Sequence, residues 1–276
     1  MKHTIKQLLN LKETNGDIGL EIEMETNKSL HHEFDGGSKI PAGPCWKLET
    51  DNSLKGYAGE WVFKKPLPLD KVGGAIASLE AGLKMEGITI NDSVRAGVHI
   101  HLNMQTLTEA ELVRFLLVYY SLETFLVNAC GDGRQGNLFC LRVQDADGHI
   151  QMLNNYIHSG LLNHIKHSEM RYCSLNIQSL FTYGSVEFRA IRTPQDLSSL
   201  IFWCELFVRM RTFAKNLDGC WDIVAKISGD GPSEWARTVL GDEAYQKLRY
   251  QGDESDILND IRRIQFTCFT ATEKGM

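Results

Sequence analysis

Apolar and polar residues alternate along residues 17–25. The apolar positions are Ile18, Leu20, Ile22 and Met24, and the positions between them hold Gly19, Glu21, Glu23 and Glu25. Side chains of a strand point alternately to opposite faces, so this pattern predicts a strand with one apolar face and one face that carries three carboxylates. Carboxylates about 7 Å apart on one face repel one another unless cations or basic side chains lie across from them. The alternative to a binding site is an outer strand face that is simply solvated. The residues on the other predicted strands distinguish these two interpretations.

The same alternation recurs in the strands predicted further along the chain. They cover residues 57–63, residues 95–104 and two segments within residues 171–192, joined by a turn at Tyr183-Gly184. Their polar positions hold Glu60, His99, His101, Asn103, Asn176, Glu187 and Arg189. Glu60 shares its face with Ala58 and Val62, which places it on a largely apolar side. An ordinary solvated face would be rich in Thr, Ser and Lys, so these residue types favour a site.

Helical periodicity predicts the elements that cover the apolar face of the sheet. Helices are expected over residues 70–86, 106–129, 150–165 and 193–217, with two or three more around residues 221, 235–249 and 256–266. The second of these helices begins with two overlapping capping boxes, one opened by Thr106 and one by Thr108. Thr193 is expected to cap the fourth, with Pro194 at its first position. The prediction is an α+β fold whose sheet carries helices on one face and leaves its polar face open.

Composition and charge narrow the classes of function. The chain has 276 residues, a net charge of −6 and a pI of about 5.9, so it has no global electrostatic reason to bind nucleic acid or an anionic membrane. No stretch predicts a transmembrane helix, and the N-terminus lacks the apolar core of a secretory signal. Seven cysteines without a CxxC pair indicate a reducing compartment and argue against a structural zinc site. A cytoplasmic protein is expected.

The residues predicted to share the polar face are of types that bind divalent cations. Carboxylates with one or two histidines suit Mg²⁺ or Mn²⁺, hard cations that prefer oxygen ligands and tolerate an imidazole. The HxH pair at His99 and His101 also occurs in zinc and cupin sites, but neither HExxH nor a close cupin-like Glu follows it. Arg189 and Arg171 add positive charge suited to phosphate oxygens. Metal ions flanked by arginines point to nucleotide chemistry.

Six short motifs follow one another between residues 17 and 192. They are Gly19-x-Glu21-x-Glu23, Asp51-x-Ser53, Glu60, Gly97-Val98-His99-Ile100-His101, the segment from Arg171 to Asn176, and Val186-Glu187-Phe188-Arg189. In this order they resemble the amidoligase family, carboxylate–amine ligases similar to glutamate–cysteine ligase and glutamine synthetase. The resemblance implies a glutamine-synthetase-like catalytic fold, a curved antiparallel sheet whose concave face holds ATP and two or three divalent metal ions.

The resemblance also implies roles for individual residues. Those that look like metal ligands are Glu21, Glu23, Glu60, His99 and Glu187. Arg189 looks like the residue that contacts the transferring phosphoryl group. Further candidates for contacts with nucleotide or substrate are His101, Asn103, Arg134, Arg171, Asn176 and Arg192.

Ligase chemistry of this kind gives the polar face a role in two steps. A carboxylate is a poor electrophile, so ATP would first convert it to an acyl phosphate, with metal ions and Arg189 stabilising the charge on the γ-phosphoryl group. An amine would then displace phosphate once an anionic side chain had bound its ammonium form and taken its proton. Asp51 is the first candidate for this base and Glu25 the second. The expected partners are a small-molecule or peptide carboxylate and an amine.

Three other functions compete with the ligase. A guanidino phosphotransferase shares the general architecture, although the GxExE and GVHIH segments favour the ligase. A non-catalytic nucleotide- or metal-binding module ranks lower, because all the expected ligand types are present. A structural protein with solvated strand faces would keep or gain stability when Glu21 or Glu187 is replaced by Gln. The chain is interpreted as one domain, with a catalytic core at about 17–217 and a helical extension at 218–276 that offers a surface for packing or for a homo-oligomer.

Overall fold

The computed structural model describes residues 3–32, 37–131, 133, 138, 140–145, 148–166 and 171–276. Within these residues six strands form one open antiparallel sheet in the order β2-β3-β1-β4-β6-β5. The strands are β1 (Ile18–Thr26), β2 (Trp46–Glu49), β3 (Tyr57–Phe63), β4 (Gly97–Asn103), β5 (Leu175–Asn176) and β6 (Ser185–Arg192). The predicted combination of helices with an antiparallel sheet is confirmed.

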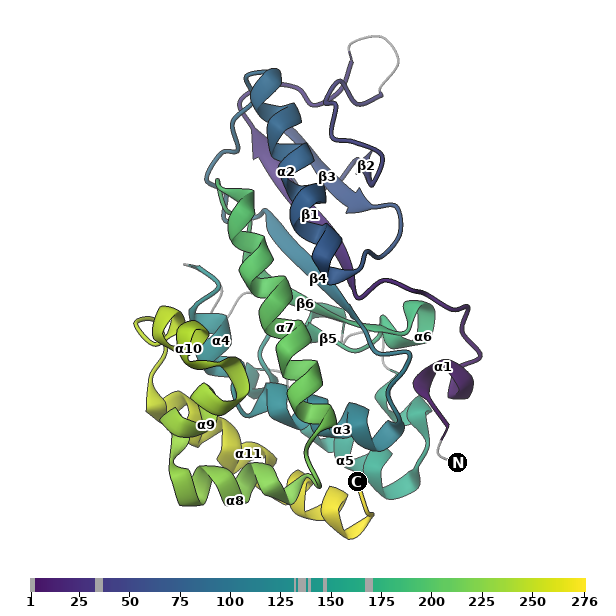
Figure 1. The fold of residues 1–276 in the computed structure, drawn as a ribbon, viewed down its shortest axis with the longest axis vertical. Coiled ribbons are helices and arrows are strands. Elements are labelled where there is room, and N and C mark those ends of the chain that lie inside the picture. Colours follow the sequence, from purple (N-terminus) through teal and green to yellow (C-terminus); the bar gives the residue numbers. More distant parts are fainter. Residues whose placement is uncertain are drawn as a thin grey trace.

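Helices cover one face of the sheet and extend beyond it. Figure 1 shows α2 and α7 running across the same face, with the other large helices gathered below the sheet. The helices are α1 (Ile5–Leu8), α2 (Leu69–Met85), α3 (Glu109–Tyr120), α4 (Glu123–Asn128), α5 (His149–Ser159), α6 (Leu180–Tyr183), α7 (Leu200–Lys215), α8 (Trp221–Asp230), α9 (Pro232–Leu240), α10 (Asp242–Leu248) and α11 (Glu254–Glu273). Across the described residues, no helix has the length and apolar character needed to span a membrane.

The alternation of β1 is reproduced in its burial. Its apolar residues Ile18, Leu20, Ile22 and Met24 are at most 1% exposed, whereas the glutamates between them are only partly buried. Burying an aliphatic side chain contributes roughly 1.5–3 kcal/mol, so this row fixes which face of β1 meets the helices. The three glutamates are thereby held on the opposite face.

Phe188 anchors β6 from the same apolar side. Its ring stacks on Phe207 of α7, with the ring centroids 3.5 Å apart, and meets Phe115 and Tyr119 of α3 edge-on. Because neighbouring residues of a strand point to opposite faces, a buried Phe188 presents Glu187 and Arg189 to the polar face. The helical layer therefore positions the polar side chains through the apolar residues between them.

Two features of the β2–β3 region differ from the prediction. Strand β2 was not predicted, and its four residues add an edge strand beside β3. The buried residues of β3 are Gly59, Trp61 and Phe63. Glu60 therefore lies on the open polar face with the other candidate ligands, opposite Glu23 of β1. Ala58 and Val62 share this face with it, as predicted, but they are only partly buried, so the side is open and not largely apolar.

The helix predicted over residues 106–129 is divided into α3 and α4. It opens with a single capping box at Thr108, and the chain turns at Ser121–Leu122. The backbone N–H and the hydroxyl of Thr124 donate to the buried carboxylate of Asp260 in α11, at 2.7 and 2.8 Å. The cap of α4 comes from a residue 136 positions away, so no local sequence signal could mark this break.

The second half of the chain also departs from the predicted boundaries. Strand β5 has two residues and is followed by the short α6, and α7 begins at Leu200 and not at Thr193. Thr193 instead donates its hydroxyl to the carbonyl oxygen of Glu23, at 2.6 Å. After residue 217 the chain forms four helices and not two or three, because Gly241, with φ +90°, separates α9 from α10.

Candidate active site

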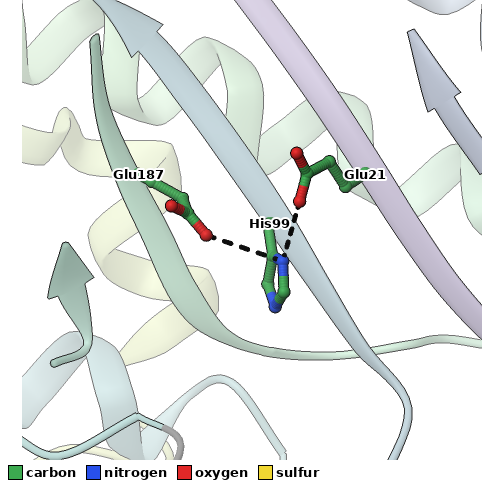
Figure 2. A group of neighbouring side chains, drawn as sticks. All are labelled: Glu21, His99 and Glu187. Carbon is green, nitrogen blue, oxygen red and sulfur yellow. Dashed lines mark hydrogen bonds and ion pairs between the residues drawn. The ribbon is translucent and has the colours of Figure 1, made fainter. Parts of the chain in front are cut away.

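A first group of possible metal ligands comes from three neighbouring strands. Figure 2 shows Glu21 of β1 and Glu187 of β6 approaching His99 of β4 from opposite sides. Nδ1 of His99 lies 3.0 Å from Oε2 of Glu21 and 3.6 Å from Oε1 of Glu187. One ligand atom from each residue lies within 4.8 Å of the others, a spacing that a single divalent cation could bridge.

A second group shares the same histidine. Nε2 of His99 lies 3.8 Å from Oε1 of Glu23, and Glu23 pairs across the sheet with Glu60. A neutral imidazole has only one nitrogen with a free lone pair. If both groups held a cation, His99 would ligate one of them and carboxylates would dominate the other. Oxygen-rich sites with a single imidazole match the preferences of Mg²⁺ and Mn²⁺ better than those of zinc.

The protonation equilibria of these carboxylates differ from one strand position to the next. Burial, together with repulsion from Glu21, raises the pKa of Glu60 to about 7. Burial also raises the pKa of Glu23. Burial opposes ionisation of Glu21 as well, but its hydrogen bonds with His101 and His99 outweigh this and hold its pKa well below the usual range. The face thus combines Glu21, whose ionised form His101 and His99 favour, with two carboxylates that are costly to ionise without a cation.

The raised pKa of Glu60 predicts how stability depends on pH in the absence of divalent cations. In the unfolded chain Glu60 titrates near its ordinary value of 4.5, and in the folded chain at about 7. Between these values the folded protein binds more protons, so the free energy of unfolding falls as pH rises from about 4.5 through about 7. Glu60→Gln should remove this penalty and add about 1–2 kcal/mol at pH 8, after allowance for solvent screening.

Urea denaturation of both proteins in EDTA at pH 5 and pH 8 measures this difference. The variant should gain stability relative to the wild type at pH 8 and little at pH 5. His101 also has a raised pKa, because its hydrogen bond with Glu21 outweighs the effect of burial, and its contribution likewise falls as pH rises. It is present in both proteins and cancels in the comparison. An equal gain at both pH values would contradict the raised pKa of Glu60.

Arg189 lies beside the first group with part of its guanidinium free. One terminal nitrogen pairs with Oε1 of Glu187, whereas the buried Nε has no acceptor among the described residues. An unsatisfied buried donor costs about 1–3 kcal/mol, so a ligand oxygen in this position would be stabilised. The contact between Arg189 and a phosphoryl group stays a prediction, and this nitrogen is a donor that could make it.

Four other predicted residues lie within this face or at its border. His101 bonds through Nε2 to Glu21 and through Nδ1 to the hydroxyl of Ser185, both at 3.2 Å. Asn176 donates to Glu187, and Asn103 donates to the carbonyl oxygens of Thr14 and Gly16. Asn103 therefore fixes the segment that precedes β1 against the end of β4. The charge of Asp51 contributes to the raised pKa of both Glu23 and Glu60.

The remaining candidates lie outside both groups of possible ligands. Glu25 accepts a hydrogen bond from the backbone N–H of Lys55 at 2.8 Å. Arg192 pairs with Asp92 and donates to the carbonyl oxygen of Ser93 at the far end of β6. Arg171 is exposed, with its guanidinium carbon 4.6 Å from the centroid of the Tyr172 ring. Arg134 lies outside the described residues.

A cavity that no sequence motif predicted adjoins the first group. It has a volume of about 470 Å³, and Glu21 and His101 line it together with Lys12, Lys47, Lys64 and Lys65. Lys47 pairs with Glu49, whereas the other three lysines have no ion-pair partner among the described residues. Gly19 lies on the floor, where an added Cβ would come within 3.1 Å of Cβ of His101. The Lys64-Lys65 pair at the end of β3 was the available sequence signal.

Comparisons with known proteins identify the family of the chain. A family model described as a putative amidoligase enzyme matches residues 19–208, and this range includes every possible metal ligand named above. No curated protein matches the chain in sequence. A bifunctional glutathione synthetase from Pasteurella multocida is similar in structure at 10% sequence identity and a TM-score of 0.38, over 94% of this chain. The chain spans about half, 51%, of that protein. Because the family model covers most of its length, the chain belongs to the amidoligase family.

Proposed function

We propose that the protein is an ATP-dependent, ADP-forming carbon–nitrogen ligase that joins a carboxylate to an amine through an acyl phosphate. The observation that carries the proposal is the pair of carboxylate groups around His99, next to the buried Nε of Arg189, which has no acceptor among the described residues. Family membership supports a ligase that forms amide bonds. ATP, the metal ions and a glutamine-synthetase-like form of the sheet are parts of the proposal, as are action as one cytoplasmic domain and association into a homo-oligomer.

The donor set supports two neighbouring divalent cations. Glu21, Glu187 and His99 would hold one ion, and Glu23 and Glu60 would hold the other. Mg²⁺ or Mn²⁺ held by these residues would supply positive charge that stabilises the charge developing on the transferred phosphoryl group. The chain itself contributes the strand register, which holds these side chains in place before any ligand binds.

The positive charge of the lysines around the cavity favours binding of the nucleotide on that side of the polar face. Three of them have no ion-pair partner in the part of the chain that the structure describes, and the cavity opens beside Glu21 and His101, so a polyphosphate there would reach the first group. Asp51, Glu23 and Glu60 make the surroundings of the second group acidic. Opposite charges would therefore direct the anionic nucleotide and the cationic amine to different sides of the same face.

The side chains on the polar face have roles in both steps of the reaction, formation of the acyl phosphate and its reaction with the amine. A carboxylate oxygen of the acid attacks the γ-phosphorus of ATP, the bond from this phosphorus to the bridging oxygen breaks, and ADP leaves. Arg189 donates to the phosphoryl oxygens, which stabilises the charge that they carry in the transition state. Asp51, or Glu25 in second place, accepts a proton from the ammonium form of the amine. The amine nitrogen then bonds to the acyl carbon, the bond from this carbon to the phosphate oxygen breaks, and phosphate leaves as HPO4²⁻ with the proton that the nitrogen loses.

Thermal denaturation with ATP or ADP, with and without Mg²⁺, tests the proposal without knowledge of the acid or the amine. A ligand that binds only the folded protein stabilises it by about 2.7 kcal/mol at a hundredfold excess over its Kd. The wild type should gain several degrees only when nucleotide and Mg²⁺ are both present. Glu60→Gln should lose most of this gain, although its stability without metal is higher.

Two further outcomes separate the alternatives. Lys64→Ala combined with Lys65→Ala should weaken the stabilisation by nucleotide and leave the binding of Mn²⁺ alone unchanged, because these lysines lie in the cavity and in neither ligand group.

Nucleotide binding without ADP release across a screen of acid–amine pairs would favour the non-catalytic module. No stabilisation at millimolar nucleotide with Mg²⁺ would contradict the ligase.

A further inference from the structure

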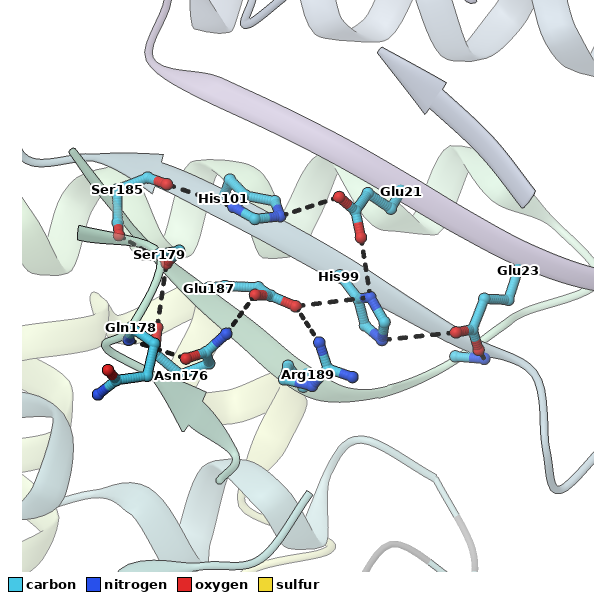
Figure 3. Close-up of polar contacts among 11 residues, drawn as sticks. Glu21, Glu23, His99, His101, Asn176, Gln178, Ser179, Ser185, Glu187 and Arg189 are labelled. Atoms are coloured by element: carbon cyan, nitrogen blue, oxygen red, sulfur yellow. Dashed lines mark hydrogen bonds and ion pairs between the residues drawn. The ribbon is translucent and has the colours of Figure 1, made fainter. Parts of the chain in front are cut away.

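Asn176 is hydrogen-bonded to Glu187, one of the possible metal ligands, and is not among the residues that line the cavity. Its Nδ2 donates to Oε2 of Glu187 at 2.6 Å, and the two residues are direct cross-strand partners in β5 and β6. Figure 3 shows the amide lying against the carboxylate, with Arg189 and His99 on the other side of Glu187. Both residues are buried, Asn176 at 6% and Glu187 at 5% exposure.

The orientation of the Asn176 amide is fixed by a second hydrogen bond. Its Oδ1 accepts from the backbone N–H of Gln178 at 2.8 Å, so the nitrogen end must face Glu187. The hydroxyl of Ser179 in turn donates to the carbonyl oxygens of Asn176 and Ser185, at 3.2 and 2.6 Å. These bonds hold the two-residue strand β5 against β6 at the position of Glu187.

The two oxygens of Glu187 are thereby given different partners. Oε2 is held by Asn176, and Oε1 is directed toward Arg189 and Nδ1 of His99. A carboxylate free to rotate would exchange its oxygens, and one oxygen would leave the position shared with His99 and Glu21. A donor fixed on the far oxygen prevents this, in the way that outer partners orient metal-binding side chains.

We infer that Asn176 is a positioning residue that holds Glu187 for a divalent cation, and not a contact of the nucleotide as the sequence suggested. The inference rests on the proposed function, since it assigns a cation to the group formed by Glu21, His99 and Glu187. It adds a residue that acts through Glu187 and touches neither substrate nor metal.

Titration with Mn²⁺ alone, with free Mn²⁺ followed by electron paramagnetic resonance, tests this role. Asn176→Ala removes both hydrogen bonds of the amide. Asn176→Ser keeps an oxygen that can accept from the N–H of Gln178, as serine does in such turns, but is too short to reach Glu187. Both variants should bind one Mn²⁺ tenfold to a hundredfold more weakly and retain the affinity of the ion held by Glu23 and Glu60.

The control is Gln178→Ala, which lies beside Asn176 but loses only a hydrogen bond from its side chain to the carbonyl oxygen of Ile165. It should lower the melting temperature and leave both Mn²⁺ affinities unchanged, which separates positioning from general stability. Wild-type Mn²⁺ affinity in folded Asn176→Ser would overturn the inference and leave the ligase proposal intact. A wild-type protein that binds no Mn²⁺ would overturn both.

Discussion

His99→Ala is expected to weaken binding of the divalent cation that Glu21, His99 and Glu187 would hold on the polar face. His99 is the one residue common to the groups found among the described residues. Its Nδ1 faces Glu21 and Glu187, and its Nε2 faces Glu23. Loss of an outer partner of a ligand already costs tenfold to a hundredfold in affinity, so loss of the shared imidazole should cost at least about a hundredfold. ADP release should fall by two to three orders of magnitude, because a bound cation supplies several kcal/mol of charge stabilisation.

His158→Ala is the matched control, since it removes an exposed histidine of α5 that belongs to neither group. It should bind Mn²⁺ as the wild type does. Isothermal titration of both variants with Mn²⁺, and assays with each active acid–amine pair, provide the comparison. If His99→Ala retained both cations with unchanged affinity, the carboxylates alone would hold the metals and His99 would be assigned to orienting Glu21.

The polar face could be predicted because strand alternation is a local property. Glu21 and Glu23 lie where the pattern put them, since the residues between them are buried. Glu60 also lies on the polar face with the other candidate ligands, but Ala58 and Val62 made its side of β3 look largely apolar, and only the burial of Trp61 settles the face. The pattern of one strand was therefore insufficient where its two faces are similarly apolar.

To predict which side chains on neighbouring strands touch, the strand register must be known, and the register is a property of the whole sheet. The pairing of β4 with β6 shifts between Val98 and Ile100, so His99 lies at an irregularity that alternation does not reveal. Such bulges redirect side chains near active sites. The partner of Asn176 likewise follows from its register with Glu187. The sequence indicated which residue types share the face, but not which of them touch.

The lysine cavity was missed for a related reason. Lys12 precedes the first strand, Lys47 belongs to an unpredicted strand, and Lys64 and Lys65 follow a third. Nothing in their spacing along the chain shows that they border one cavity. The division of α3 from α4 is a similar case, because Asp260 supplies the cap from a distant helix.

Arg189→Ala is expected to abolish phosphoryl transfer while metal binding is retained. An arginine that stabilises the transferring phosphoryl group contributes about 10³–10⁵ in rate, so ADP release in an active acid–amine pair should fall at least about a thousandfold. Arg189→Lys should recover little of it, because an ammonium group lacks the planar fork that donates to two oxygens at once. The rate of ADP release at saturating Mg²⁺ and nucleotide measures this effect.

The behaviour of Mn²⁺ in the same variants separates two explanations of a slow enzyme. Arg189 pairs with Oε1 of Glu187, the oxygen nearest to His99. Removing the guanidinium takes away a cation that competes for this oxygen, so Arg189→Ala should bind Mn²⁺ as tightly as the wild type or more tightly. This contrasts with His99→Ala, in which binding and turnover fall together. If Arg189→Ala lost Mn²⁺ along with turnover, Arg189 would act by supporting the position of Glu187, and its assignment to the phosphoryl group would be wrong.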